Sequence, residues 1–249
     1  MISFIFLFFT ALAAQALSVM VANVSERPRE IKVEQQLDNW LTLLREDQKP
    51  SLTVLVNHPL KKEESRKSAP VGVSILSRLP KVHSKNRVVT QTLTIVQATL
   101  LLPDQRHLQV LAVRFPDRNK FPVAHDKALK QLAKIRIGLP KKDLVIAAGD
   151  FGLSRSVDSL EKISERFLQP HWVMGHQLNC RTPTAQPCQG TSLVAESLQD
   201  SFQEMILLDK DFYDGLKGWR VSRDQNLTLR PATPLPGEHW PLIVSFLPN

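Results

Sequence analysis

Two apolar runs, one in the middle of the chain and one near its end, dominate the hydrophobic pattern. The first covers residues 143–150 and ends in Gly149-Asp150, and the second covers residues 237–246 and carries Glu238-His239 near its start. Short β-branched and apolar runs bounded by turn residues are typical of buried strands. The pattern predicts two core strands that bring two carboxylates and a histidine to the edge of a sheet.

The rest of the pattern predicts strands and helices that interleave in one domain. Apolar residues at helical spacing, or a plausible helix cap, predict helices over residues 30–46, 124–137 and 156–167. Alternating or continuous apolar runs predict strands over residues 17–23, 51–57, 71–77, 90–102, 107–115 and 202–208. Residues 169–191 read as a loop and residues 216–230 as a mixed segment. This order favours two packed sheets flanked by helices.

The N-terminal residues indicate an exported protein. Residues 2–14 are almost wholly apolar, and Ala14-Gln15-Ala16 has the A-x-A form of a signal-peptide cleavage site. We expect a signal peptide over residues 1–16, a single domain over residues 17–249, a periplasmic or secreted location, and no stable membrane span after cleavage. The alternative is an uncleaved membrane anchor, because the uncharged stretch reaches Ser25.

The two cysteines fit an oxidising compartment. Cys180 and Cys188 lie eight positions apart in a Pro-rich segment, and in an exported protein such a pair favours a disulfide. Two free thiols are the alternative, and two thiols alone offer too few ligands for a metal site.

Composition and charge leave the partner open. The chain has 249 residues, is 43% hydrophobic and carries a formal net charge of +8, which suits one large globular domain. Its Lys and Arg residues are scattered without one dominant block, so solubility explains them as well as an anionic partner does. The sequence shows no groove of aromatic and basic residues that would support a nucleic-acid partner. We expect a monomer.

Three segments resemble the DNase I-like endonuclease/exonuclease/phosphatase superfamily. They are VSILSRLP at residues 73–80, LVIAAGDF at residues 144–151 and EHWPLIVSF at residues 238–246, and the order of elements agrees over residues 17–247. The resemblance implies a four-layered α/β/β/α sandwich of two mostly antiparallel mixed sheets. It also implies hydrolysis of phosphoesters with a divalent metal, usually Mg²⁺.

The resemblance also implies a set of site residues. Asp150 and His239 occupy the positions of catalytic residues, and Asn23, Glu204 and Glu238 occupy positions near the metal, with Glu standing for Asp at both acidic positions. From the residues alone, two alternatives stay open. His239 could cap a strand, and Asp150 could form a turn by bonding its own backbone.

Other positions depart from the family's pattern. The principal metal-binding glutamate falls at Asn57, a histidine falls at Arg114, and the asparagine after the motif's Asp is Gly152. Asn57 offers only a neutral oxygen where Mg²⁺ usually takes a carboxylate. Arg114 can hold an anion bidentately but cannot exchange protons at neutral pH.

These departures set the functional expectation. We expect a non-catalytic or strongly diverged protein that binds an anionic or phosphorylated ligand in the old active-site cleft through Arg114 and needs no cofactor. The alternative is an active Mg²⁺-dependent phosphodiesterase or phosphatase that uses Asp150, Glu238 and His239, so the sequence leaves enzymatic activity undecided.

Overall fold

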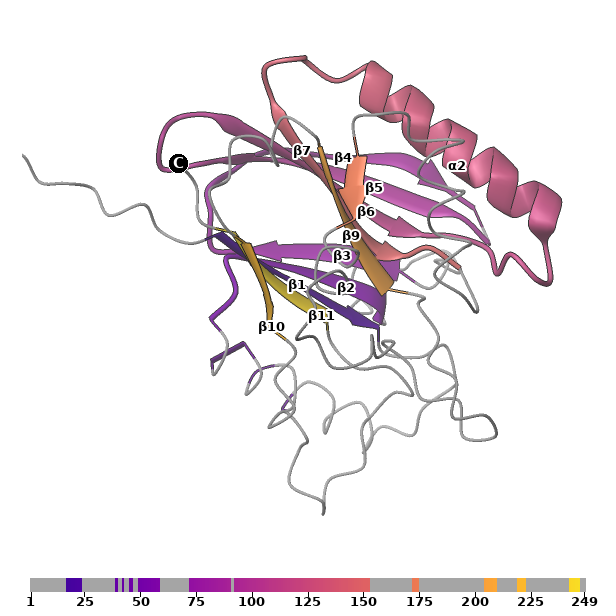
Figure 1. Ribbon diagram of the computed structural model, residues 1–249, viewed down its shortest axis with the longest axis horizontal. Coiled ribbons are helices and arrows are strands. Elements are labelled where there is room, and N and C mark those ends of the chain that lie inside the picture. The colour runs from indigo at the N-terminus through magenta and orange to yellow at the C-terminus, as the bar shows by residue number, and fades with distance from the viewer. Residues whose placement is uncertain are drawn as a thin grey trace, which may run out of the picture.

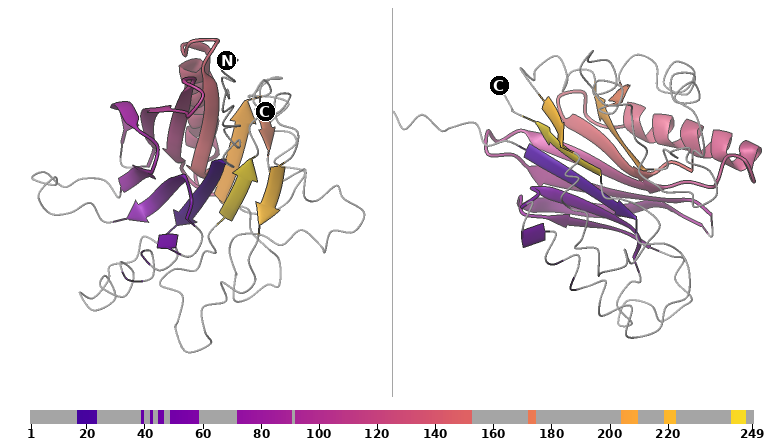
Figure 2. Two further views of the ribbon diagram at one scale, coloured as in Figure 1. Left: turned by 90° about the vertical axis from the view of Figure 1, so that its left-hand side faces the viewer. Right: turned by 60° about the horizontal axis from the view of Figure 1, so that its bottom comes forward.

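Two β-sheets face each other, and one long helix covers the outer face of the larger sheet (Figure 1). The computed structural model describes residues 17–23, 49–58, 72–90, 92–152, 172–174, 204–209, 219–222 and 242–246, together with residues 39, 42, 45 and 46. Strands β1 and β2 of one sheet contact β7 of the other across the interface, and the opposed sheets are visible from two further directions (Figure 2).

The smaller sheet has five strands in the order β10-β11-β1-β2-β3. Its strands are β1 (Leu17–Asn23), β2 (Leu52–His58), β3 (Gly72–Ser77), β10 (Trp219–Ser222) and β11 (Leu242–Phe246). β1 and β2 are parallel, and the other pairs are antiparallel. The sheet is therefore mixed, and the last strand of the chain pairs with the first.

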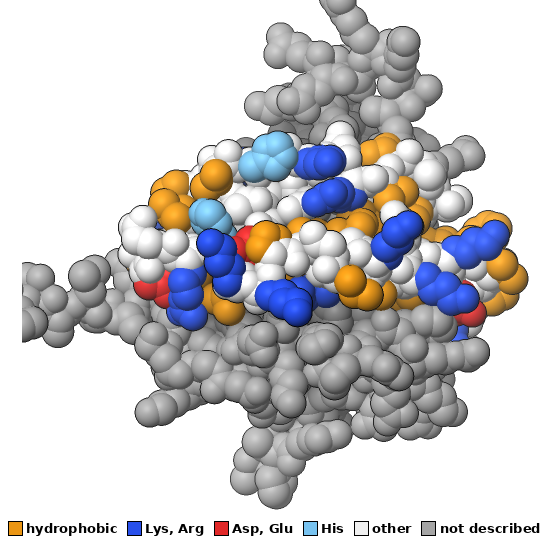
Figure 3. Space-filling view, turned by 90° about the horizontal axis from the view of Figure 1, so that it is seen from above, with side chains coloured by type: hydrophobic (Ala, Val, Ile, Leu, Met, Phe, Trp, Pro, Cys, Tyr) orange, Lys and Arg blue, Asp and Glu red, His pale blue; other side chains and the backbone are white. Residues whose placement is uncertain are grey.

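The larger sheet has six strands in the order β4-β5-β6-β7-β9-β8. Its strands are β4 (Lys81–Val89), β5 (Thr94–Leu101), β6 (His107–Arg114), β7 (Leu144–Asp150), β8 (Trp172–Met174) and β9 (Glu204–Asp209). β6 and β7 are parallel, and helix α2 (Pro122–Ile137) connects them. Seen from above, the molecule shows Lys and Arg side chains interspersed with hydrophobic and other side chains (Figure 3).

Strand periodicity divides the core into two clusters. Alternate residues such as Val21 of β1, Val54 of β2 and Ala112 of β6 are fully or almost fully buried between the sheets. The residues that point the other way on the larger sheet, such as Leu111, pack under α2 with Leu129. Because successive side chains on a strand point to opposite faces, one strand contributes to both clusters.

The structure confirms the predicted pair of packed sheets. The first strand has the predicted bounds, and strands and a helix occur within the predicted ranges 51–57, 71–77, 107–115 and 124–137, with shifts of one or two residues at their ends. Within the predicted helix 30–46, the four described residues 39, 42, 45 and 46 are all helical.

Three expectations about strands need correction. The strand predicted over residues 90–102 begins only at Thr94, and β4 precedes it where no strand was expected. β4 lies at the edge of its sheet and is exposed along almost its whole length, so it lacks the apolar face that marks an inner strand. β8 lies inside the predicted loop 169–191, and its three residues are too few to give a recognisable period.

Other expectations fall outside the described residues. These are the signal peptide over residues 1–16, the helix over residues 156–167, and Cys180 and Cys188. No helix within the described part of the chain is long and apolar enough to cross a membrane.

Candidate functional site

Polar residues stand at the ends of three strands, immediately beyond the buried residues of the core. Asn23 comes two residues after Val21 on β1, and Asp150 comes two residues after Ala148 on β7. Since both preceding residues belong to the cluster between the sheets, the alternation places these polar residues in the same inter-sheet layer. Arg114 ends β6 in the same way and lies opposite Asp150 in the β6–β7 register.

A chain of side-chain amides connects the two sheets at this edge. Asn57 Nδ2 donates to Asn23 Oδ1 at 2.8 Å, and Asn23 Nδ2 donates to Asp150 Oδ2 at 3.3 Å. An ionised carboxylate can only accept hydrogen bonds, so Asn23 must turn its NH₂ group towards Asp150 and its oxygen towards Asn57. The charge on Asp150 thus fixes the orientation of both amides.

Asp150 also bonds to the backbone that follows it. The Gly152 N–H donates to Asp150 Oδ1 at 2.7 Å, so each carboxylate oxygen accepts at least one hydrogen bond. The turn-forming alternative for Asp150 is therefore part of its structure, and the same side chain bonds to the facing sheet through Asn23. Its geometry supports a positioned carboxylate, while its predicted catalytic role stays a prediction.

Two glycines allow this edge to close. Gly149 has a φ of 143°, and a Cβ atom there would lie 2.0 Å from the Val113 carbonyl oxygen. Gly152 has a φ of 61°, and a Cβ atom there would lie 2.2 Å from the Pro116 carbonyl oxygen. Only glycine accommodates both the backbone conformation and the close approach, so these positions bring Asp150 beside β6.

Helix α2 supports the turn from behind through a buried histidine. His125 is 0% exposed, and its Nε2 lies 2.8 Å from the Phe151 carbonyl oxygen. The carbonyl can only accept, so Nε2 carries the hydrogen. Burial lowers the pKa of His125, and this effect outweighs the bond to the Phe151 carbonyl, which raises it. The neutral ring therefore holds the backbone one residue after Asp150.

The sequence reasoning missed this role of His125. The available signal was a single histidine on the otherwise apolar face of α2 that buries Ala128, Leu129 and Leu132. A histidine on such a face needs a hydrogen-bond partner in the core, but the sequence does not say which carbonyl supplies it.

Asn57 carries a buried, unsatisfied polar atom at the start of the amide chain. It has a φ of 58° at an irregularity in the β2–β3 pairing, a left-handed conformation that Asn adopts more readily than most residues. Its side chain is 6% exposed, and its Oδ1 is buried without a hydrogen-bond partner. A buried acceptor without a partner is costly, so this oxygen has capacity for a donor or cation from a ligand.

Arg114 places a half-buried cation next to Asp150. Burial lowers the pKa of the Arg114 guanidinium, and the negative charge of Asp150 opposes that shift without cancelling it. Arginine stays protonated at neutral pH all the same. The direction of the shift means that Asp150 offsets only part of the cost of burying this cation.

The remaining predicted site residues are placed only in part. Glu204 begins β9, and its backbone pairs with Asp150. Glu238 and His239 lie outside the described residues. β11 begins at Leu242, opposite Val21 of β1, so the chain enters its last strand at the edge where Asn23 lies.

The described donors do not by themselves fit a divalent metal ion. No group of three or more His, Cys, Asp or Glu side chains converges within the described part of the chain. Asp150 is the carboxylate of the described site, both of its oxygens accept hydrogen bonds, and Arg114 places a positive charge beside it. Mg²⁺ prefers hard, anionic oxygen ligands, which this set supplies poorly.

Known structures share this arrangement of sheets. A D. rerio TDP2 humanised by 14 mutations superposes with a TM-score of 0.69 at 13% identity, over 93% of this chain and 98% of that one. An AP endonuclease from Archaeoglobus fulgidus superposes with a TM-score of 0.64 at 12% identity, over 92% and 99% of the two chains.

The human Nocturnin catalytic domain gives a TM-score of 0.62 at 14% identity, over 94% of this chain and 95% of that one. The chain has the DNase I-like fold. No family model matches the sequence, and no curated protein matches it either. The predicted sandwich is thus confirmed, and at identities this low the DNase I-like fold is what the likeness establishes.

Proposed function

We propose that the strand-end site binds an anionic, phosphate-like group through Arg114, and that metal-dependent hydrolysis has been lost or strongly altered. The observation that carries the proposal is a half-buried arginine at the end of β6, opposite Asp150 in the β6–β7 register. A guanidinium binds a phosphate-like group through charge-assisted, bidentate hydrogen bonds, which are among the strong ones in proteins.

The donor set supports binding over hydrolysis. A neutral amide, Asn57, stands where the resemblance implies the principal metal-binding carboxylate, and its Nδ2 is used by Asn23. A fixed cation would compete with a divalent metal for Asp150, whereas it would attract a phosphate. Solved structures of the same fold support the ligand class: Nocturnin was obtained with a bound sulfate anion and D. rerio TDP2 with a single-strand DNA product.

Calorimetric titration of the full chain with inorganic phosphate and with phenyl phosphate tests the proposal. We expect Arg114→Gln to weaken binding about 10- to 100-fold, the size of a lost hydrogen bond to a charged group. Arg106→Gln is the matched control, since Arg106 lies at the other end of β6 in an exposed pair with Asp104. Equal affinities for the wild type and the Arg114→Gln variant would overturn the proposal.

One observation favours the alternative, an active phosphoesterase that uses Asp150, Glu238 and His239. The buried Asn57 Oδ1 has no partner among the described residues and is a neutral oxygen that a hard cation could take. The decisive assay is hydrolysis of bis(p-nitrophenyl) phosphate with Mg²⁺ or Mn²⁺. Metal-dependent turnover that disappears in Asp150→Asn would replace binding by catalysis as the function, and absence of turnover together with absence of metal-binding heat would support binding.

A further inference from the structure

The positive charge of the chain is concentrated around α2. Residues 118–142 contain eight Lys or Arg residues and one acidic residue, Asp126. This segment therefore has a formal charge of +7, against +8 for the whole chain. Its longest run of adjacent basic residues is the pair Lys141-Lys142, which is why the charge looks scattered when it is read along the sequence.

The helix collects this charge on one side. Val123, Lys127, Lys130, Lys134 and Ile137 are all exposed, and their spacing of three and four residues places them on a single face. At 1.5 Å per residue they form a ridge about 21 Å long. The opposite side of α2 packs on the sheet, so this ridge faces outwards.

Helix stability does not explain the ridge. Cations stabilise the last turn of a helix and oppose its first turn, so the helix dipole accounts for Lys134 but not for Lys120 and Lys127 at the other end. The first turn has no acidic residue. The spacings from Lys127 to Lys130 and from Lys130 to Lys134 bring like charges together, which costs the helix stability. An anionic surface beside the ridge would remove that cost.

Exposed apolar side chains lie on or next to the charged helix, and on the edge strand β4. The large hydrophobic residues that are exposed in the described part of the chain all belong to β4, to α2 or to the residue before α2: Val82, Val89, Phe121, Val123 and Ile137. Val123 is 67% and Ile137 is 83% exposed. Lysines on β4 are explained as protection of an edge strand, but its exposed valines are not.

We infer that the exposed ridge of α2 docks the domain on a lipid bilayer that contains anionic phospholipid. Basic residues interspersed with exposed apolar ones are typical of peripheral membrane surfaces, where cations bind headgroups and apolar side chains enter the interface. Phosphates of a nucleic acid would use the lysines equally well but would leave Val123 and Ile137 without a role. Lipid accounts for both sets, and this inference is independent of the anion site at Arg114.

Vesicle sedimentation of the full chain tests the inference. Affinity is measured for anionic vesicles of phosphatidylglycerol and phosphatidylcholine and for neutral vesicles of phosphatidylcholine alone, and the readout is the first affinity divided by the second. An apolar segment such as residues 2–14 would contribute equally to both affinities, so it cancels in the ratio. We expect the triple variant Lys127→Gln, Lys130→Gln, Lys134→Gln to lower this ratio about 100-fold, as three interfacial charges imply. Glutamine keeps the helix propensity close to that of lysine.

The matched control removes the same charge elsewhere. Arg45, Lys49 and Arg78 are exposed near the start of β2, where the Lys49 N–H bonds the Arg45 carbonyl and the Arg78 N–H bonds the Ser51 carbonyl. The variant with Gln at these three positions should keep an affinity ratio, anionic over neutral vesicles, close to that of the wild type. Equal losses in the two triple variants, or a wild-type ratio near one, would overturn the inference.

A second pair of measurements separates lipid from nucleic acid. Val123→Gln with Ile137→Gln should weaken binding to anionic vesicles several-fold and leave the anisotropy of a labelled 20-nucleotide DNA unchanged. One result would assign the ridge to nucleic acid and overturn the inference. In that result the lysine variant binds DNA more weakly than the wild type but binds anionic vesicles equally well, and DNA binding by the wild type weakens steeply with salt.

Discussion

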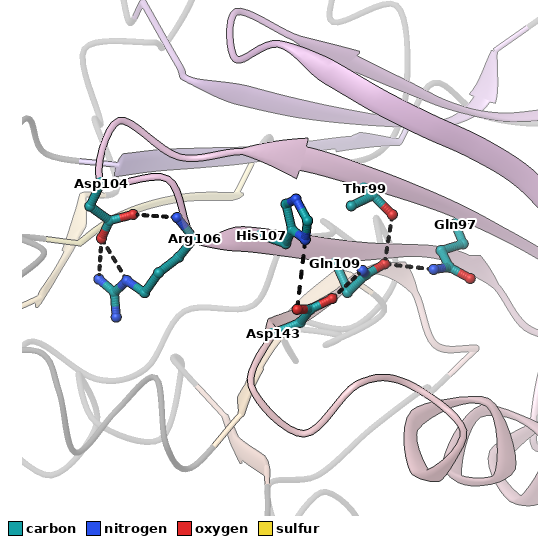
Figure 4. A network of polar contacts seen from close by, with 7 residues as sticks. All are labelled: Gln97, Thr99, Asp104, Arg106, His107, Gln109 and Asp143. Carbon is teal, nitrogen blue, oxygen red and sulfur yellow. Dashed lines mark hydrogen bonds and ion pairs between the residues drawn. The ribbon is translucent and has the colours of Figure 1, made fainter.

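Two chains of buried amides, each ending on an aspartate, behave in opposite ways. On the outer face of the larger sheet, Gln97 Nε2 donates to Gln109 Oε1 and Gln109 Nε2 donates to Asp143 Oδ2, both at 2.6 Å (Figure 4). Thr99 donates to the same Gln109 oxygen at 2.9 Å, and Arg87 donates to the Gln97 oxygen. Every amide oxygen of this outer chain therefore has a donor.

The inner chain, from Asn57 through Asn23 to Asp150, is left open. It uses the same chemistry, but the Asn57 oxygen at its start has no donor among the described residues, and Arg114 is half-buried at its end. A satisfied polar network rigidifies a fold, and a partly satisfied one costs stability. The comparison suggests that the outer chain serves structure and the inner one serves a ligand.

The largest expected effect comes from breaking the closed chain. Gln109→Leu leaves the buried Asp143 carboxylate, the Gln97 amide and the Thr99 hydroxyl without their partner, and should lower the free energy of unfolding by about 3 kcal/mol. Urea denaturation measures it. Phosphate affinity should not change, because Gln109 lies on the opposite face from Arg114.

The control for this variant is Arg106→Gln, which removes an exposed ion pair and should cost less than about 1 kcal/mol. A loss of that small size in Gln109→Leu would mean that the closed chain contributes no more than a surface contact, and the comparison would fail.

A smaller effect should appear in the pH dependence of stability, through His125. Burial lowers the pKa of His125 in the folded protein, while in the unfolded chain it titrates near its ordinary value of about 6.5. As pH falls below that value the unfolded chain binds more protons than the folded one, so the free energy of unfolding decreases as pH falls from 6.5 towards the folded-state pKa.

Urea titrations at several pH values check this dependence. His125→Gln should remove the decrease, since glutamine can still donate to the Phe151 carbonyl but does not titrate. His83→Gln, a change of an exposed histidine on β4, should preserve it. A decrease of equal size in the His125→Gln variant would show that the support behind Asp150 is not a neutral histidine.

The smallest effect on stability should follow from opening the inner chain further. Asn57→Gly loses one hydrogen bond to Asn23 but also removes the unsatisfied oxygen and relaxes a left-handed backbone position. These changes oppose each other, so the free energy of unfolding should stay within about 1 kcal/mol of the wild type. A loss as large as that of Gln109→Leu in the same urea experiment would show that the inner chain is a structural network as well.

Much of the fold was predictable because it depends on local periodicity. The apolar run of β7 and the turn after Asp150 could be recognised without any tertiary information, and the resemblance supplied the two-sheet order. β4 was missed because an exposed edge strand has no apolar face, and β8 because three residues are too few for a pattern. The charge of α2 looks scattered along the sequence because helical spacing separates residues that the fold brings onto one ridge.

The sequence by itself determined which residues of the inner strands are buried, since alternation along those strands assigns their apolar side chains to a layer. It also supplied the candidate polar residues at the strand ends. Only the tertiary structure decided which of them meet: Asn23 and Asp150 are 127 positions apart and touch because β1 and β7 face each other across the core. Whether a buried amide chain is closed or open depends on such contacts between sheets, and local sequence does not encode them.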